Sequence, residues 1–395
     1  MDLRITDISF RDFRSYESFH LGGIGPLTVL VGPNAIGKTN VVEGIQLLTA
    51  QSSFRHPTGV QLVREGASLA QLSAEASDGN RQLTLGLAIE AGKRRFTMNG
   101  KPKRAVDLKG VIPSVAFTPD DLELAKGSMT GRRNALDGVG SQLSKNHYLI
   151  RRDWDKVLRN KNALLKDEAS PLLIESLNDM MVTCGAQLVC YRAALFEKLG
   201  RAMASHYHDI TGGREQLAAR YAPSWYEEGR WIEPGVRLER DKVREEMAAA
   251  LKSQAAAERA RRRSLVGPHA DRIEFYVEGR PVGIYGSQGQ QRSVVLAFKL
   301  AEVTLICDLL GQKPVLLLDD VMSELDAQRR ASLVKFVSGD IQTFITTANL
   351  AYFDDDVLAA ARVVRMPMEE GGAPWLDWAM GCSSFCRAWG SRAPR

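Results

Sequence analysis

Apolar and polar residues alternate in short runs over roughly the first 120 residues of the chain. An alternation of this kind is typical of half-buried β-strands. Strands are predicted over residues 4–10, 27–31, 83–89 and 95–98. Residues 39–48 differ, because their apolar positions recur at helical spacing directly after a strand and a glycine turn. The first part of the chain is therefore expected to be rich in strands, with one early helix.

Long helical periodicity replaces this pattern between residues 120 and 263, with a break at residues 210–214 and a last helix over residues 241–263. Strands and helices then alternate, as they do in βαβ units. Three further strands are predicted over residues 272–277, 314–319 and 343–347, and two further helices over residues 290–310 and 327–338.

The two strand-containing segments predict one α/β unit made of residues 1–119 and 265–367, with a helical lobe over residues 120–264 inserted between them. For residues 368–395 the pattern predicts no fold. No internal repeat or heptad array is present, and this excludes a long coiled coil.

The composition is that of an ordinary globular protein, with 395 residues, 44% of them hydrophobic and 25% charged. A net charge of +5 allows a polyanionic partner but does not require one. The N-terminal residues lack the apolar core of a secretory signal, and no apolar run is long enough to span a bilayer. The five cysteines form no C-x-x-C pair or zinc-ligand cluster. We expect a cytoplasmic protein with reduced thiols and no membrane partner.

Eight residues between the strand at 27–31 and the next helix match the phosphate-binding pattern G-x-x-x-x-G-K-[ST]. The residues are Gly32, Pro33, Asn34, Ala35, Ile36, Gly37, Lys38 and Thr39. The glycines allow the backbone to turn its N–H groups and the helix N-terminus towards a phosphate. Lys38 is expected to reach the β- and γ-phosphates of ATP, and Thr39 a bound Mg²⁺ ion.

An apolar strand over residues 315–318 ends in two carboxylates, as a Walker B strand does. Asp319 is the expected metal-side residue, which would hold Mg²⁺ through a water molecule or through Thr39. Asp320 is placed where a carboxylate can orient or deprotonate the attacking water, so we assign it a catalytic role together with Lys38.

Residues 285–292 resemble the signature motif of ABC ATPases and precede a predicted helix. A small hydroxyl and a glycine at a helix N-terminus form an anion site, which one chain cannot bring to its own phosphate loop. In a head-to-tail homodimer, Ser287, Gly289 and Gln290 of one subunit would cap the γ-phosphate held by the other, and we therefore also assign Ser287 a catalytic role. Asp326 lies in a segment that resembles the D-loop, which touches the opposite nucleotide site in ABC dimers.

With these motifs in order around a helical insertion, the chain resembles the RecF family of bacterial DNA replication and repair proteins, which are ABC/SMC-like ATPases. The resemblance extends over most of residues 3–350 and is carried by the segments DFRSY at 12–16, SFR at 53–55, FTPDDLELAKG at 117–127, LVGPHADRIEF at 265–275, SQGQQRS at 287–293, LLLDDVMSELD at 316–326 and FITTANL at 344–350.

The resemblance implies an ABC-type P-loop ATPase head with an inserted helical lobe, and an ATP-dependent DNA-binding protein. It implies action at gapped DNA and stalled forks with RecO and RecR, loading of RecA and support of the SOS response. It also suggests that Arg14 approaches the nucleotide, although a surface ion pair is an equal alternative. Candidate DNA contacts are Arg55, Lys93, Arg94, Arg95, Lys101, Lys103, Arg104, Arg151, Arg152, Arg261, Arg262 and Arg263.

Two features depart from ABC ATPases in general. Thr347 and Asn349 follow where a switch histidine would stand, and no glutamine marks a Q-loop, whose place is taken by residues 117–121. We therefore expect a weak DNA-dependent ATPase in which ATP acts mainly as a switch that closes a dimer on DNA.

Two other classes of protein share part of the pattern. A transporter ATPase subunit would need a membrane partner and usually a clear Q-loop and switch histidine. A P-loop small-molecule kinase would use Lys38 and Asp319 but would leave the signature and D-loop segments without a purpose. A DNA-binding ATPase is the class of protein in which all of these motifs would have a role.

Overall fold

A computed structural model describes residues 2–337 and 340–367 of the chain. The chain divides into two compact units. The first unit is Met1–Pro119 with Ile306–Arg395, and the second is Asp120–Leu305. In both units, strands that are distant in the sequence pair with one another. The first unit contains the phosphate-binding loop and both Walker B carboxylates.

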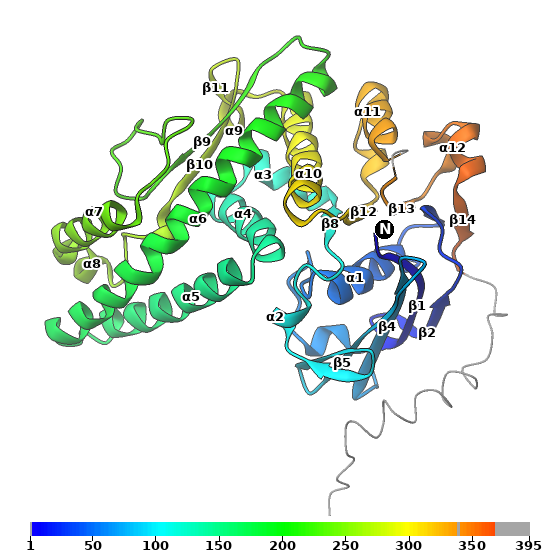
Figure 1. Cartoon of the computed structure of the whole chain (residues 1–395), viewed down its shortest axis with the longest axis horizontal. Helices are drawn as coiled ribbons and strands as arrows, with labels where there is room; N and C mark the ends of the chain where they lie inside the picture. Colours follow the sequence, from blue (N-terminus) through cyan, green and yellow to red (C-terminus); the bar gives the residue numbers. More distant parts are fainter. Residues whose placement is uncertain (1, 338–339, 368–395) are drawn as a thin grey trace, which may run out of the picture. The chain divides into compact units, whose positions relative to one another are not determined.

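A parallel five-stranded sheet forms the centre of the first unit, in the order β14-β3-β13-β12-β8 (Figure 1). Its strands are β3 (Leu27–Val31), β8 (Ser114–Phe117), β12 (Val315–Asp319), β13 (Thr343–Thr347) and β14 (Arg362–Arg365). Every residue of β12 and β13 is buried, as expected for parallel strands covered on both faces. Since the strands run in parallel, the carboxyl ends of β3, β13 and β12 lie at one edge of the sheet.

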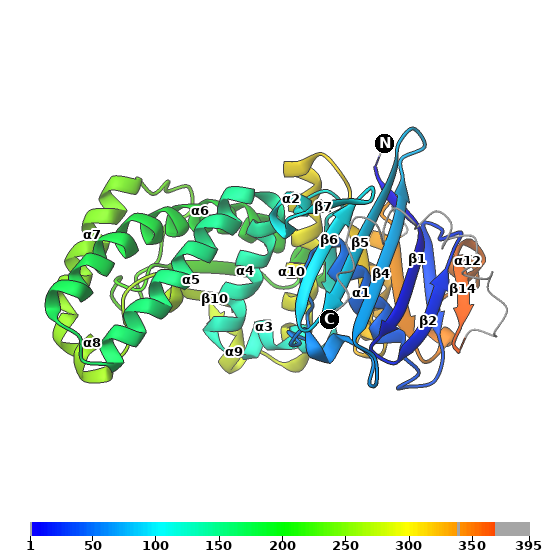
Figure 2. The same cartoon turned by 90° about the horizontal axis from the view of Figure 1, so that it is seen from below.

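The second sheet of this unit has six antiparallel strands in the order β2-β1-β4-β5-β6-β7, and Figure 2 shows them side by side. Their bounds are β1 (Arg4–Phe13), β2 (Tyr16–Leu21), β4 (Leu69–Ser77), β5 (Gln82–Glu90), β6 (Lys93–Met98) and β7 (Lys101–Lys103). Burial alternates along β4, with one face packed into the core.

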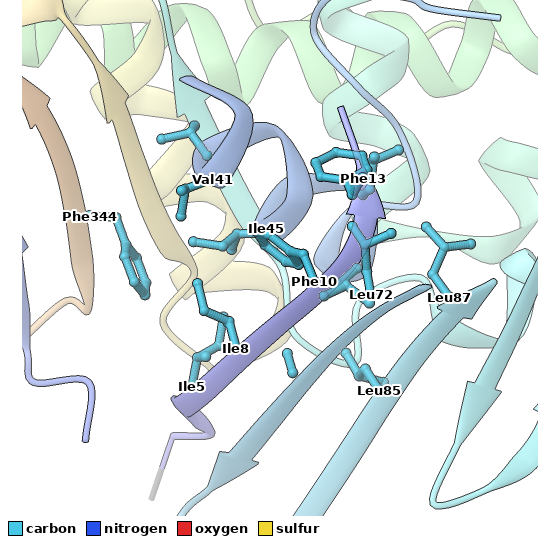
Figure 3. Close-up of a cluster of buried hydrophobic side chains, with 14 of the residues drawn as sticks. Ile5, Ile8, Phe10, Phe13, Val41, Ile45, Leu72, Leu85, Leu87 and Phe344 are labelled. Atoms are coloured by element: carbon cyan, nitrogen blue, oxygen red, sulfur yellow. The ribbon is translucent and has the colours of Figure 1, made fainter. Parts of the chain in front are cut away.

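Helix α1 (Lys38–Thr49) packs against strands of both sheets, and its apolar residues recur at helical spacing. Ile45 of this helix lies beside Phe10 of β1, and Phe344 of β13 closes the core on the side of the parallel sheet (Figure 3). Phe10 stacks on Phe19 with ring centroids 5.4 Å apart. The core that holds the start of α1 in place is thus built from both sheets.

The first unit also contains several shorter helices. They are η1 (Val60–Leu62), α2 (Ala105–Leu108), η4 (Val321–Ser323), α11 (Ala327–Val337), η5 (Leu350–Tyr352) and α12 (Asp355–Ala360).

The second unit is mainly helical and contains a small antiparallel sheet in the order β11-β10-β9. Its strands are β9 (Leu217–Ala222), β10 (Arg272–Val277) and β11 (Arg280–Pro281). Its helices are α3 (Glu123–Lys126), α4 (Met129–Leu143), α5 (Lys145–Lys166), α6 (Pro171–Thr211), α7 (Arg240–Ser253), α8 (Ala255–Arg261) and α9 (Val282–Tyr285), with the short turns η2 (Pro119–Leu122) and η3 (Pro268–Ala270). The long helix α10 (Gln288–Leu310) begins in this unit.

A buried ion network ties the helices of the second unit to its sheet. Arg192 of α6 donates to both carboxylate oxygens of Asp137 at 2.8 and 2.7 Å and lies 3.2 Å from the Asp271 carboxylate. All three side chains are buried, so removing the charge of Arg192 would leave two buried carboxylates without this cation. The network therefore fixes the turn before β10 against α4 and α6.

Most of the elements predicted from the sequence are confirmed, including the early helix, observed as Lys38–Thr49, and the strands Arg272–Val277 and Thr343–Thr347. One predicted helix is wrong in its length, because the chain between residues 241 and 263 forms two helices that meet at Gln254. The position at which the chain re-enters the first unit also differs from the prediction, which placed it at residue 265. Residues up to Leu305 group with the second unit, because β10 pairs with β9 there.

Replacement of Phe10 by alanine tests the packing between α1 and the two sheets. We expect Phe10→Ala to lower the free energy of unfolding by about 3–5 kcal/mol, because it removes a fully buried ring and leaves a cavity. The control is Arg11→Ala, because Arg11 is exposed on the same strand. This variant should change the free energy of unfolding by no more than about 0.5 kcal/mol. Urea unfolding of the two variants measures both values, and equal losses would contradict this account of the core.

Candidate nucleotide-binding site

Residues 32–39 form a tight loop between β3 and α1, and its two glycines are required by the geometry. Gly37 has φ 106°, a left-handed conformation, and a Cβ atom there would lie 2.6 Å from the Tyr16 hydroxyl. A Cβ atom on Gly32 would lie 2.6 Å from the backbone oxygen of Met366. Because any side chain would push the loop away from its neighbours, the loop can keep this curl only with glycine at both positions.

A cavity of about 270 Å³ lies against this loop and the start of α1. Its lining residues are Asn34, Ala35, Gly37, Lys38, Thr39, Asn40, Arg55, Asp320 and Thr346. The N-terminus of α1 carries unpaired backbone N–H groups and the positive end of the helix dipole, both of which attract an anion. Five of the eight loop residues predicted from the sequence line this space, which suits phosphate, whereas Gly32, Pro33 and Ile36 do not line it.

The ammonium group of Lys38 is held inside the loop. Its Nζ donates to the backbone oxygens of Gly32 at 2.6 Å and Pro33 at 2.8 Å. An ammonium group has three N–H donors, so these two bonds leave one for a ligand. Burial lowers the pKa of Lys38, and the negative charges of Asp320 and Asp319 oppose that shift. The cation is thus fixed in position beside two carboxylates.

Asp319 at the end of β12 is buried and accepts two hydrogen bonds at a single oxygen, Oδ1. Thr39 of α1 donates from 3.0 Å and Thr346 of β13 from 2.7 Å. Burial raises the pKa of Asp319, and the two hydroxyl donors work against that shift. The structure thereby brings together the two predicted metal-side residues, Thr39 and Asp319.

Asp320 follows in a left-handed backbone conformation with φ 52°, which is unusual for a residue other than glycine. Its backbone N–H donates to the Thr346 hydroxyl at 2.9 Å, and its side chain lines the cavity. Burial raises the pKa of Asp320, while the positive charge of Lys38 lowers it. The strained backbone turns this carboxylate away from the strand and towards the space above the loop.

Three residues at the cavity were not among the predicted nucleotide-binding residues: Asn40, Arg55 and Thr346. Arg55 was predicted as a DNA contact, yet its guanidinium donates to Asn40 Oδ1 at 2.9 Å and lines the cavity. In the sequence, the place of Arg55 in the SFR segment is the feature that could have indicated a role at the nucleotide site. Arg14 does not line the cavity but pairs with buried Glu43 at 2.9 and 2.8 Å.

The predicted signature segment forms the N-terminus of α10, in the second unit. The Ser287 hydroxyl accepts from the Gln290 N–H at 3.1 Å, and the Gln290 side chain accepts from the Ser287 N–H at 2.9 Å. This reciprocal capping box fixes the exposed serine at the end of the helix. The hydroxyl acts as an acceptor in this capping box. Gly289 follows within the first turn of the same helix.

The D-loop segment ends in Asp326, whose carboxylate accepts from the Arg329 N–H at 2.9 Å and also pairs with the Arg329 guanidinium. It therefore caps α11. In the segment that stands in place of a Q-loop, Asp121 pairs with Lys299 of α10 at 2.9 Å. The P-loop, Asp319, Asp320 and Asp326 belong to the first unit, and Ser287, Gly289 and Gln290 to the second.

The donor set around Asp319 suits Mg²⁺, which binds through one or two protein oxygens and takes its other ligands from phosphate and water. Thr39 Oγ1 and the Asp319 carboxylate supply such oxygens. Across residues 2–337 and 340–367, no group of three or more His, Cys, Asp or Glu side chains could hold a metal ion. Among these same residues, no helix is both long and apolar enough to cross a membrane.

The RecF/RecN/SMC N terminal domain family matches residues 4–373. The DNA replication and repair protein RecF of Synechococcus sp. (strain JA-3-3Ab) is 36% identical over 90% of this chain and 93% of its own length. That of Lacticaseibacillus casei (strain BL23) is 33% identical over 92% of this chain and 98% of its own. These similarities extend far beyond the phosphate-binding loop.

Solved structures agree with this similarity. The recombination mediator protein RecF with ATP, in the RecFOR pathway, superposes with a TM-score of 0.81 at 28% identity, over 89% of this chain and 94% of that one. An Smc head domain from Pyrococcus furiosus, with a TM-score of 0.52 at 15% identity over 98% of this chain and 100% of that one, shows the fold alone. The predicted α/β fold, an ABC-type ATPase head with an inserted helical lobe, is confirmed.

Replacement of Asp319 by asparagine tests the burial of this carboxylate. The asparagine Oδ1 can accept both threonine bonds, so Asp319→Asn removes a buried charge and keeps the contacts. The pKa of Asp319 is raised in the folded protein, so its ionised form opposes folding at neutral pH. We expect the variant to unfold at higher urea concentration than the wild type at pH 7.

The advantage of Asp319→Asn should shrink as the pH falls through the raised pKa towards the ordinary value of 3.8, because the wild-type carboxyl group then becomes neutral. Glu17→Gln, at an exposed position on β2, is the matched control and should behave as the wild type at every pH. A variant less stable than the wild type at pH 7 would contradict the assigned cost of burial.

Proposed function

The chain belongs to the RecF family of DNA replication and repair proteins, and on that premise we propose that it binds ATP with Mg²⁺ at the cavity beside the phosphate-binding loop and uses it to control binding to DNA. The observation that carries the proposal is the hydrogen bond of 3.0 Å between Thr39 and Asp319, which joins the loop to the end of β12. A metal ion beside the phosphates would need oxygens from both segments.

Four residues at the loop and at the end of β12 have roles that follow from their contacts. Lys38 offers its remaining N–H donor to the β- and γ-phosphates, and the N–H groups of the loop surround the anion. Thr39 and Asp319 would hold Mg²⁺, which neutralises phosphate charge when bound. Asp320, directed into the cavity, orients the attacking water or takes its proton.

A second copy of the chain would complete the site. Ser287, fixed by its capping box with Gln290, can donate its hydroxyl proton to a γ-phosphate, and the N–H group of Gly289 lies in the first turn of α10. Asp326 would face the opposite site from the start of α11. ATP bound between a P-loop and a partner's signature serine favours the closed dimer by its differential affinity for that state.

Hydrolysis is slow in this proposal and serves to open the dimer. Thr347 stands where ABC ATPases carry a switch histidine, and its hydroxyl donates to the Asn349 backbone oxygen at 2.9 Å. Being used in this local bond, the hydroxyl is a poor sensor of the γ-phosphate. The chain is thus proposed to be a weak DNA-dependent ATPase in which nucleotide acts as a switch.

DNA is the proposed macromolecular partner, in gapped, single-stranded or duplex form. Three exposed lysines, Lys93, Lys101 and Lys103, lie on the β6–β7 hairpin. Contacts to phosphate give affinity without sequence information and weaken as salt rises. Membership of the family also supports the proposal that the protein is cytoplasmic and works with RecO and RecR to load RecA at gaps or stalled forks. In the same proposal, the protein contributes to the SOS response.

Replacement of Lys38 by alanine tests the nucleotide site. We expect Lys38→Ala to weaken ATP binding by at least about 10-fold, because the phosphates lose a charge-assisted hydrogen bond. Titration with a fluorescent ATP analogue measures the affinity, and Lys93→Ala, at an exposed position on β6, is the control. An unchanged affinity in Lys38→Ala would remove the phosphate-binding role from this loop.

Replacement of Ser287 by arginine tests the role of the partner subunit. The bulky cation should block closure while ATP still binds to the monomer, because Ser287 and the P-loop belong to different units of the chain. Analytical ultracentrifugation with ATP and Mg²⁺ should show dimers for the wild type and monomers for Ser287→Arg. Ser253→Arg, exposed at the end of α7, should still dimerise. Dimers that persist in Ser287→Arg would disprove the assigned interface.

A further inference from the structure

The hydroxyl group of Thr346 makes two hydrogen bonds that join it to both carboxylate residues of the site. It donates to Asp319 Oδ1 at 2.7 Å and accepts from the Asp320 backbone N–H at 2.9 Å. One side chain on β13 thus contacts the last residue of β12 and the first residue beyond it.

We propose that Thr346 is a positioning residue of the nucleotide site, which sets the direction of the Asp319 carboxylate and the left-handed backbone of Asp320 through a single hydroxyl group. The inference deepens the proposed function and rests on it. Thr346 acts through its two neighbours, and these in turn face the metal and the attacking water.

The surroundings of Thr346 hold its hydroxyl group in one position. The residue is fully buried in an interior strand between β3 and β12, so its side chain has no freedom to turn towards solvent. A β-branched side chain is in any case stiff about its first torsion angle. Thr39, the other donor to Asp319, belongs to the phosphate-binding loop and would be drawn to the ligand itself. Thr346 therefore holds the carboxylate from a strand of the sheet, whereas Thr39 holds it from the start of α1.

The geometry at Asp320 supports the same role. A left-handed conformation at a residue other than glycine persists only where its surroundings enforce it. The Asp320 N–H is bonded to both the backbone oxygen of Thr346 at 3.2 Å and its hydroxyl at 2.9 Å. The shorter of the two bonds comes from the side chain, so the threonine hydroxyl contributes to the turn that directs Asp320 into the cavity.

The other threonines of the same strand behave differently. The hydroxyl of Thr343 donates to the Ile341 backbone oxygen at 3.1 Å, and that of Thr347 donates to the Asn349 backbone oxygen at 2.9 Å. Both bonds are local along the chain. Thr346 alone among these three uses its hydroxyl for contact with another strand. Thr343, equally buried, is therefore a matched control position.

The test compares Thr346→Val, Thr346→Ser and Thr343→Val in the full-length chain. Valine keeps the shape of threonine and removes the hydroxyl, whereas serine keeps the hydroxyl. Binding of a non-hydrolysable ATP analogue is titrated against Mg²⁺ concentration, and ATP turnover is measured separately. Circular dichroism and analogue binding without Mg²⁺ establish that each variant is folded.

We expect Thr346→Val to need about 10- to 100-fold more Mg²⁺ for half-maximal analogue binding, as residues that orient metal ligands generally do when replaced. Turnover should fall as well, while binding without Mg²⁺ stays unchanged. Thr346→Ser and Thr343→Val should both show the wild-type Mg²⁺ dependence of analogue binding.

Equal Mg²⁺ dependence in Thr346→Val and the wild type would overturn the inference, and so would a Thr346→Ser variant as impaired as the valine variant. Should Thr346→Val not fold, the serine variant and Thr346→Ala decide the question by the same titration. A wild-type chain that binds no ATP analogue at all would instead refute the proposed function. The two failures are therefore distinguishable.

Discussion

One buried carboxylate oxygen, Oδ1 of Asp319, joins the two parts of the nucleotide site. It accepts hydrogen bonds from Thr39 at the start of α1 and from Thr346 on β13. A buried carboxylate is costly unless donors satisfy it, so these bonds hold three separate chain segments in one arrangement. The phosphate-binding loop, the Walker B strand and the strand beside it can serve one ligand because of this shared contact.

The packing of the first unit serves the same arrangement. Helix α1 is held between the two sheets by a core that includes Phe10 and Ile45, and this core fixes the helix N-terminus relative to the ends of β3 and β12. The left-handed conformation of Gly37 then turns the loop back over the helix. Stability and binding are thus linked, because a shift of α1 would separate Thr39 from Asp319.

Sequence motifs predicted the parts of the site that are local along the chain. The loop at residues 32–39 and the carboxylates Asp319 and Asp320 were recognisable because their spacing reflects backbone geometry that ligand binding requires. Thr346 lies in the FITTANL segment, but its role was not recognisable from the sequence, because that role depends on β13 pairing with β12. The interruption at Gln254 was missed for a related reason, because helical periodicity continues across it.

We propose that Thr39 and Asp319 hold a divalent cation beside the phosphates bound by the loop. The most direct measurement is a crystal structure with a non-hydrolysable ATP analogue and Mn²⁺ in place of Mg²⁺, with the cation located by its anomalous scattering. We expect a peak within coordination distance of Thr39 Oγ1 and next to the Asp319 carboxylate. A cation bound elsewhere, or phosphates lying away from Lys38, would contradict it.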